Sequence, residues 1–249
     1  MPGAVLSQRL GKILHMLMRL TAKVLCLVLC WPAVAWAARP FMTDDARLTT
    51  AGSCQLETWS RRYSDRSEFW ALPACNPTGN LEITAGGSSL READKSTSTD
   101  AVLQIKTLFK SMPADGWGAG VAIGHLRHRP QAPAGGGQGQ TYVYVPVSVS
   151  FAEGRFVTHS NVGWTRDRAS GQDQLTWGMG LEVQFHRRWM WIGETFGNDR
   201  QKPFWQTGLR YQLVPELLQI DATWGAPQSL RSSHNWLSFG LRWTPDKFP

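Results

Sequence analysis

Residues 175–185, LTWGMGLEVQF, decide the fold. Apolar residues alternate there with small or polar ones, and a β-strand places two such sets on opposite faces. The same alternation recurs at 101–109, 205–213, 218–224 and 237–243. One face of each strand therefore suits an apolar environment, and the other suits polar contacts.

About twelve segments of the chain are predicted to be strands of this kind: 54–63, 67–75, 80–90, 98–110, 115–127, 140–151, 155–166, 172–186, 188–197, 203–213, 216–225 and 235–244. Most approach the roughly 9–11 residues that a tilted membrane strand needs, whereas strands of soluble domains average about 5–6. Short links alternate with longer polar ones, such as 91–97 and 128–139, as in outer-membrane barrels. The sequence predicts an all-β fold, a single transmembrane antiparallel β-barrel of about 12 strands over residues 54–249. Its mean hydropathy of −0.28 excludes a polytopic helical membrane protein.

Two short turns predict the strand register. A turn at Glu153-Gly154 places Phe151 opposite Phe156. A turn at Val214-Pro215 places Tyr211 opposite Leu218, and Arg210 then lies diagonal to Asp221. Both registers put apolar residues opposite apolar residues, which a one-residue slip would destroy.

Two cysteines of the predicted barrel fall opposite each other. A turn at Ser64-Asp65 pairs Cys54 with Cys75 at a non-hydrogen-bonded position, where Cα atoms lie about 4.5 Å apart. That separation permits a disulfide, and exported proteins meet an oxidising compartment. We predict a Cys54–Cys75 bridge. No Cys/His cluster with metal-ligand spacing is present, so no metal site is expected.

The aromatic residues are predicted to form two belts at the water–lipid interfaces. The belt at the external end contains Trp164, Trp177, Trp205, Trp224 and Trp236, and the belt at the periplasmic end contains Phe109, Trp117, Phe151, Phe156, Phe185, Tyr211 and Trp243. The lipid-facing set includes Val145, Met179, Leu181, Leu209 and Ile220. A soluble β-sandwich with core aromatics is the alternative, but its strands are usually shorter.

The polar faces are predicted to line the lumen, with charges of both signs. The expected lumen-lining residues are Glu57, Glu82, Lys106, His159, Glu182, Arg210, Asp221 and Arg242, and Lys110 is expected on the same face. One interpretation is an open channel whose charges set selectivity. The other is a plugged barrel whose charges satisfy one another. No catalytic residue and no cofactor are predicted.

Residues 1–37 have the pattern of a secretory signal peptide. Basic residues precede an apolar run, which ends in the small-x-small site Ala35-Trp36-Ala37. The segment holds four of the 26 basic residues and none of the 19 acidic ones, so its removal lowers the net charge from +7 to +3. The expected location is the outer membrane of a Gram-negative bacterium. Outer-membrane lipid, small solutes and the barrel-assembly machinery are the expected partners, and nucleic acid is not. Residues 38–53 form either a periplasmic tail or a partial plug in the lumen.

The start of the predicted mature chain carries a family resemblance. Residues 38–46 read ARPFMTDDA, and Gln55-Leu56-Glu57 follows. This resembles the opening of a family of proteobacterial outer-membrane proteins labelled transporter-like or linked to the phenol meta-degradation pathway. The resemblance implies an outer-membrane barrel that passes small hydrophobic or aromatic solutes.

A lipid-modifying enzyme is the least favoured alternative. His159-Ser160-Asn161 is similar to the His-x-Ser-Asn-Gly segment of outer-membrane phospholipases. Adjacent residues of a strand point to opposite faces, however, which separates the histidine from the serine that it would activate. The favoured function is passive diffusion of small solutes, and a structural or interaction barrel with a plugged lumen is the alternative.

Overall fold

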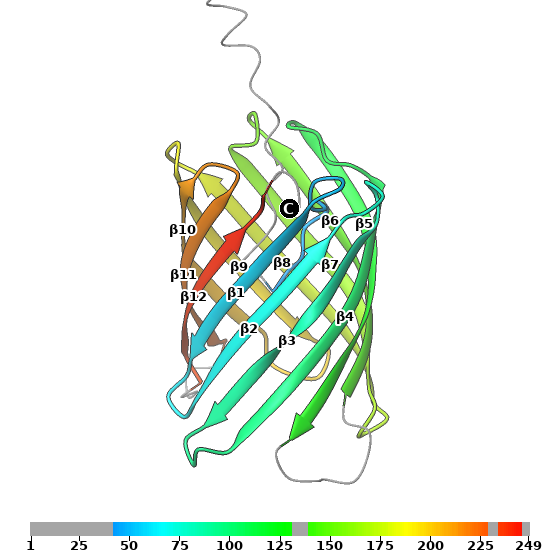
Figure 1. Ribbon diagram of the computed structural model, residues 1–249, viewed down its shortest axis with the longest axis vertical. Helices are drawn as coiled ribbons and strands as arrows, with labels where there is room; N and C mark the ends of the chain where they lie inside the picture. The colour runs from blue at the N-terminus through cyan, green and yellow to red at the C-terminus, as the bar shows by residue number, and fades with distance from the viewer. Residues whose placement is uncertain (1–41, 131–138, 229–233, 246–249) are drawn as a thin grey trace, which may run out of the picture. The chain divides into compact units, whose positions relative to one another are not determined.

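The chain folds as one closed antiparallel β-barrel (Figure 1). The computed structural model describes residues 42–130, 139–228 and 234–245. In these residues, twelve strands follow one another around the barrel in chain order, and the first closes against the last. They are β1 Cys54–Arg62, β2 Arg66–Cys75, β3 Glu82–Glu92, β4 Thr97–Lys110, β5 Gly116–Pro130, β6 Gly139–Phe151, β7 Phe156–Asp167, β8 Asp173–Gln184, β9 Trp189–Asn198, β10 Phe204–Val214, β11 Leu218–Pro227 and β12 Trp236–Trp243. The predicted all-β barrel is confirmed, and the predicted strand ends lie within a few residues of these.

The barrel has two rims. The N-terminal rim carries Cys54 and the links 76–81, 111–115, 152–155, 185–188 and 215–217. The opposite rim carries Arg62 and the links 63–65, 93–96, 168–172 and 199–203. The two longest intervals between successive strands, from Pro130 to Gly139 and from Pro227 to Trp236, also begin and end at this rim. Since barrels of this class have short periplasmic turns and longer external loops, the opposite rim corresponds to the external side.

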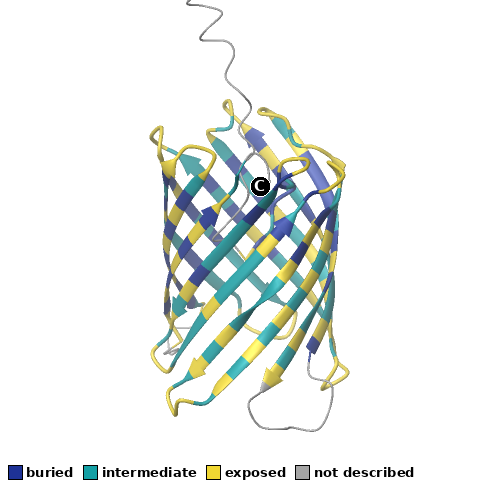
Figure 2. Cartoon of the chain, in the orientation of Figure 1, coloured by how far each residue is buried: buried dark blue, intermediate teal, exposed yellow. Residues whose placement is uncertain are grey.

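Burial alternates along the strands, as Figure 2 shows. In β12, Leu237 and Phe239 are 52% and 62% exposed, whereas Ser238 between them is 2% exposed. The predicted lipid-facing residues Val145, Met179, Leu209 and Ile220 are all exposed, and Leu181 is half-buried. The outer wall is thus an apolar band, which suits hydrocarbon rather than water. None of the described residues forms a helix long and apolar enough to cross a membrane.

The predicted register is confirmed in two hairpins and wrong in a third. Cys54 lies opposite Cys75, and Phe151 lies opposite Phe156. In the β10–β11 hairpin, however, Tyr211 lies opposite Ile220 rather than Leu218. The turn is longer than predicted, with Glu216 at a φ of 65° and a bulge between Gln212 and Val214. The shift is an even number of residues, so every side chain stays on its predicted face.

Two other predictions were wrong about a side chain's direction. A bulge between Leu108 and Lys110 turns Lys110 outward, where its Nζ lies 3.8 Å from the ring centroid of Trp117. Trp236 lies close to the opposite rim but is 4% exposed, and its indole N–H donates to Gln206 inside the barrel at 3.3 Å. It therefore packs in the lumen and does not belong to a lipid-facing belt.

Candidate channel and the N-terminal segment that crosses it

Residues 42–53, called here the N-terminal segment, lie inside the barrel. At its start, the carboxylate of Glu194 on β9 accepts hydrogen bonds from the backbone N–H of Met42 at 2.7 Å and of Thr43 at 2.8 Å. Both carboxylate oxygens are thus used by backbone donors. Gln206 on β10 donates to the same carboxylate at 2.5 Å, which links the anchor to the wall.

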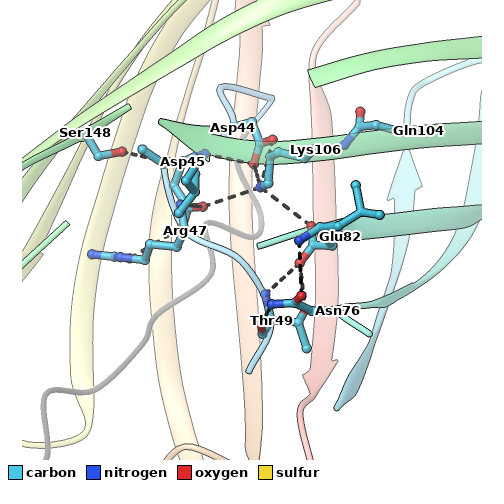
Figure 3. Close-up of polar contacts among 12 residues, drawn as sticks. Asp44, Asp45, Arg47, Thr49, Asn76, Glu82, Gln104, Lys106 and Ser148 are labelled. Atoms are coloured by element: carbon cyan, nitrogen blue, oxygen red, sulfur yellow. Dashed lines mark hydrogen bonds and ion pairs between the residues drawn. The ribbon is translucent and has the colours of Figure 1, made fainter. Parts of the chain in front are cut away.

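Asp44 is held on the other side of the bore by three residues. The Nζ of Lys106 on β4 lies 3.0 Å from the Asp44 carboxylate (Figure 3). The Tyr144 hydroxyl donates to the same carboxylate at 2.6 Å. The side-chain amide of Asn161, oriented so that both of its atoms are satisfied, accepts from Asp44 N at 2.7 Å and donates to Asp44 O at 2.9 Å. Asp44 therefore contacts β4, β6 and β7 together.

The later part of the segment is anchored to β3 and then joins the N-terminal rim. Glu82 accepts from the backbone N–H and the hydroxyl of Thr49, at 2.7 and 2.8 Å (Figure 3). Asn76 donates its side-chain amide to Thr49 O at 2.7 Å, and its backbone carbonyl accepts from Gly52 at 2.8 Å. The segment thus crosses the bore from β9 to β3 before β1 begins.

A second charged cluster surrounds Glu182 on β8. Arg210 donates to this carboxylate at 2.6 Å, Arg47 of the segment lies 3.6 Å from it, and His159 Nε2 lies 3.7 Å from it. Three cationic or titratable side chains therefore face one carboxylate. The side chains of Arg210, Glu182 and His159 are all at most 1% exposed, so this cluster is buried rather than solvated.

Close approach of the segment to the wall depends on a glycine. A Cβ added at Gly178 on β8 would collide with the side chain of Thr43. Glycine there has an ordinary strand conformation, so its role is space and not backbone freedom.

A cavity of about 560 Å³ lies in the lumen between the N-terminal segment and part of the wall. Its wall is rich in aromatic and apolar side chains from β1, β2, β6, β9 and β10: Trp59, Trp70, Leu72, Tyr142, Phe196 and Phe204. Trp59 and Trp70 stack in parallel with ring centroids 5.3 Å apart. Met42, Asp44 and Arg47 of the segment close one side. The site combines an aromatic wall with a charged boundary.

The eight predicted lumen-lining residues fall into two groups. Glu57, Glu82 and Lys106 line the cavity. Arg242 and Asp221 are each 5% exposed. They lie outside the cavity lining, as do His159, Glu182 and Arg210. Arg210 and Asp221 are directly opposite in the register, not diagonal. The polar face was thus predicted as one set, but the structure divides it between a cavity and a buried cluster.

Sequence reasoning missed the contacts of the segment with the wall. Asp44 pairs with Lys106 of the wall, and Asp45 lies 3.5 Å from Arg47 of its own segment. The signal was present in the motif at 38–46. Its described part, residues 42–46, supplies backbone N–H groups and a carboxylate that form hydrogen bonds with side chains of the wall.

The neighbours of His159 do not match the phospholipase-like segment. His159 faces Ser148 across the β6–β7 register, whereas Ser160 faces Val147 on the outer wall. Ser148 Oγ lies 2.8 Å from His159 Nδ1, which completes a Ser–His–Glu series with Glu182. The serine hydroxyl also accepts from Ala46 N at 2.9 Å, and Ser148 has no exposed surface. In this position the series anchors the N-terminal segment. The described residues contain no group of three or more His, Cys, Asp or Glu side chains arranged to hold a metal ion.

A family model described as "Uncharacterised conserved protein UCP029691" matches residues 26–243. The chain belongs to this family. No curated protein sequence matches it.

Solved structures share the barrel fold at low sequence identity. The KdgM porin in complex with disordered oligogalacturonate has a TM-score of 0.59 and 7% identity, covering 77% of this chain and 99% of its own. The NanC porin has a TM-score of 0.55 and 12% identity, covering 77% of this chain and 100% of its own. These likenesses show an outer-membrane barrel fold.

Proposed function

We propose that this protein is an outer-membrane channel through which small solutes with a hydrophobic or aromatic group diffuse passively. It would act in the outer membrane of a Gram-negative bacterium after residues 1–37 are removed. The observation that carries the proposal is the cavity of about 560 Å³ with an aromatic wall. Binding sites for small molecules fall in the range of about 300–1,000 Å³ and are lined mainly by apolar and aromatic side chains.

The wall chemistry supports the choice of solute. An aromatic ring can stack on Trp70 or pack against Phe196, and the hydroxyl of Tyr142 offers a polar contact. The charged boundary formed by Asp44, Arg47 and Lys106 favours solutes that also carry a polar group. The resemblance of residues 38–46 to proteins linked to the phenol meta-degradation pathway supports the same class. Passage also requires that the N-terminal segment leaves part of the bore open.

Single-channel conductance in planar bilayers tests this function. The wild-type protein is expected to conduct, and benzoate, used as an aromatic probe, is expected to shorten the open events. Trp70→Ala should weaken the block by benzoate because it removes a stacking surface. Phe69→Ala is the matched control, since Phe69 is the neighbouring residue, is 53% exposed and lies on the outer wall. Equal block in both variants would show that the aromatic wall does not select the solute.

A structural barrel with a plugged lumen is the second candidate. It is favoured by the path of the N-terminal segment, which joins β9, β7, β6, β4 and β3 through hydrogen bonds and ion pairs. Liposome swelling separates the two functions. Vesicles with the folded protein that exclude both benzoate and small sugars, and show no conductance, would establish the plugged barrel in place of the channel.

A further inference from the structure

Four arginines stand on the outer wall at the opposite rim. Arg62, Arg91, Arg127 and Arg129 are all exposed. Arg62 lies opposite Leu237, which is 52% exposed on the outer wall, and Arg127 shares its strand face with Ile123, which is 54% exposed. The four side chains therefore point away from the lumen.

The arginines lie at a common height although they come from different strands. Arg62 and Arg91 occupy one row of the register, both opposite Ser67, whereas Arg129 lies opposite Thr99, two residues back along the wall. Strands tilt by about 40°, so each step of about 4.8 Å to the next strand moves a row about 3 Å toward the rim, and a step of two residues back along a strand moves it about 5 Å away from the rim. The four positions thus fall within about 7 Å of one height.

That height is the edge of the apolar band. Trp117 marks the band at the N-terminal rim and is 49% exposed, and Arg127 lies ten residues further along the same strand. Ten tilted residues rise about 26 Å, which equals the height of about 25 Å expected for the apolar band of a barrel. The arginines therefore lie where lipid headgroups begin.

No carboxylate of the described residues forms an ion pair with any of the four arginines of this strip. Arg166, in contrast, is paired with Asp173 at 3.1 Å. Unpaired arginines at headgroup level are unfavourable next to hydrocarbon but bind phosphate by charge-assisted, bidentate hydrogen bonds. Basic clusters beside a membrane span bind anionic lipid headgroups.

We propose that this strip of Arg62, Arg91, Arg127 and Arg129 binds the phosphate groups of lipid A, the phosphorylated glycolipid of the outer leaflet. Acyl chains of the lipid would lie on the apolar side chains below the strip, such as Phe69 and Leu103, which are 53% and 56% exposed. The proposal rests on the outer-membrane location in the proposed function. It does not depend on solute passage.

Native mass spectrometry of the folded, detergent-purified protein tests the binding. Lipid A with both phosphates is the probe, and enzymatically dephosphorylated lipid A and phosphatidylglycerol are the comparisons. The wild type is expected to bind lipid A at least tenfold more tightly than either comparison lipid, and the preference should fall as salt rises. Equal binding of all three lipids would overturn the proposal, and so would a preference for phosphatidylglycerol.

A matched pair of variants locates the site. Replacing Arg62, Arg91, Arg127 and Arg129 by Gln should reduce lipid A binding at least tenfold. Replacing Lys110, Arg155, Arg187 and Arg188 by Gln removes the same charge from exposed positions at the N-terminal rim and should leave binding unchanged. An equal loss in both variants would show bulk charge attraction and refute the strip. If the first variant does not fold, Arg127→Gln and Arg129→Gln are measured singly, and the wild-type comparison of lipids still decides. Conductance plays no part in this readout, so a failed channel function leaves the result interpretable.

Discussion

The guanidinium of Arg210 on β10 reaches across β9 and donates to the carboxylate of Glu182 on β8 at 2.6 Å. Their side chains are 0% and 1% exposed. A buried pair of this kind is costly to break, because the remaining charge stays in a desolvated place. Arg210 therefore stabilises the folded barrel and does not line the cavity.

Arg210→Ala is expected to destabilise the folded barrel. Loss of one partner of a buried pair costs about 3–5 kcal/mol, and the proximity of Arg47 and His159 to Glu182 should keep the loss at the lower end. Urea unfolding in detergent micelles measures the change. Arg166→Ala is the control, since its pair with Asp173 is about half exposed and should contribute about 0–1 kcal/mol. Similar losses in the two variants would contradict the buried cluster.

Gly178→Val is expected to loosen the N-terminal segment and leave the barrel intact. The added side chain would occupy the place of the Thr43 side chain, so Thr43 and its contact with Glu194 must move. The prediction is a higher single-channel conductance than in the wild type. Proteolysis of the segment in folded protein should also become faster. Unchanged conductance with faster proteolysis would show that the segment does not obstruct the path of ions.

Leu209→Arg is expected to impair assembly in the membrane. Leu209 is 43% exposed on the outer wall in the middle of β10, and a charge at mid-membrane costs about 2–4 kcal/mol. Thr176→Arg places the same side chain on the cavity lining and should be tolerated better. Heat-modifiability gels report the folded fraction. Equal tolerance of both changes would argue against a lipid-facing outer wall.

The Cys54–Cys75 bridge is expected to stabilise the first hairpin without affecting transport. The two residues are joined at a sequence separation of 21, and closing a loop of roughly this length contributes about 3 kcal/mol in the chain-entropy account. Alkylation of unreduced protein should find no free thiol. The double Cys54→Ser, Cys75→Ser variant should unfold at lower urea and conduct as the wild type does. Labelling of two thiols before reduction would contradict the bridge.

The strands, their two faces and the pairing of the first hairpin could be predicted from the amino-acid sequence. Period-two alternation is local, so LTWGMGLEVQF already separates Met179 on the lipid side from Glu182 on the lumen side. A short turn also pairs residues by simple counting, which is why Cys54 and Cys75 could be matched. The counting failed at Lys110, where a bulge inserts a residue, and at the β10–β11 turn, which is longer than two residues and is followed by a bulge at Gln212. Nothing in the local pattern marks such an insertion.

The residues that fill the lumen could be identified only in the folded barrel. Asp44 and Lys106 are 62 residues apart, and Arg210 and Glu182 lie on strands that do not pair with each other. Such contacts join residues that no single hairpin pairs, so they depend on the tilt and stagger of the strands in the closed barrel. From its sequence, the N-terminal segment could either stay outside the barrel or enter the lumen. It enters because the inward carboxylates Glu194 and Glu82 accept its backbone donors, and because Gly178 leaves room for Thr43.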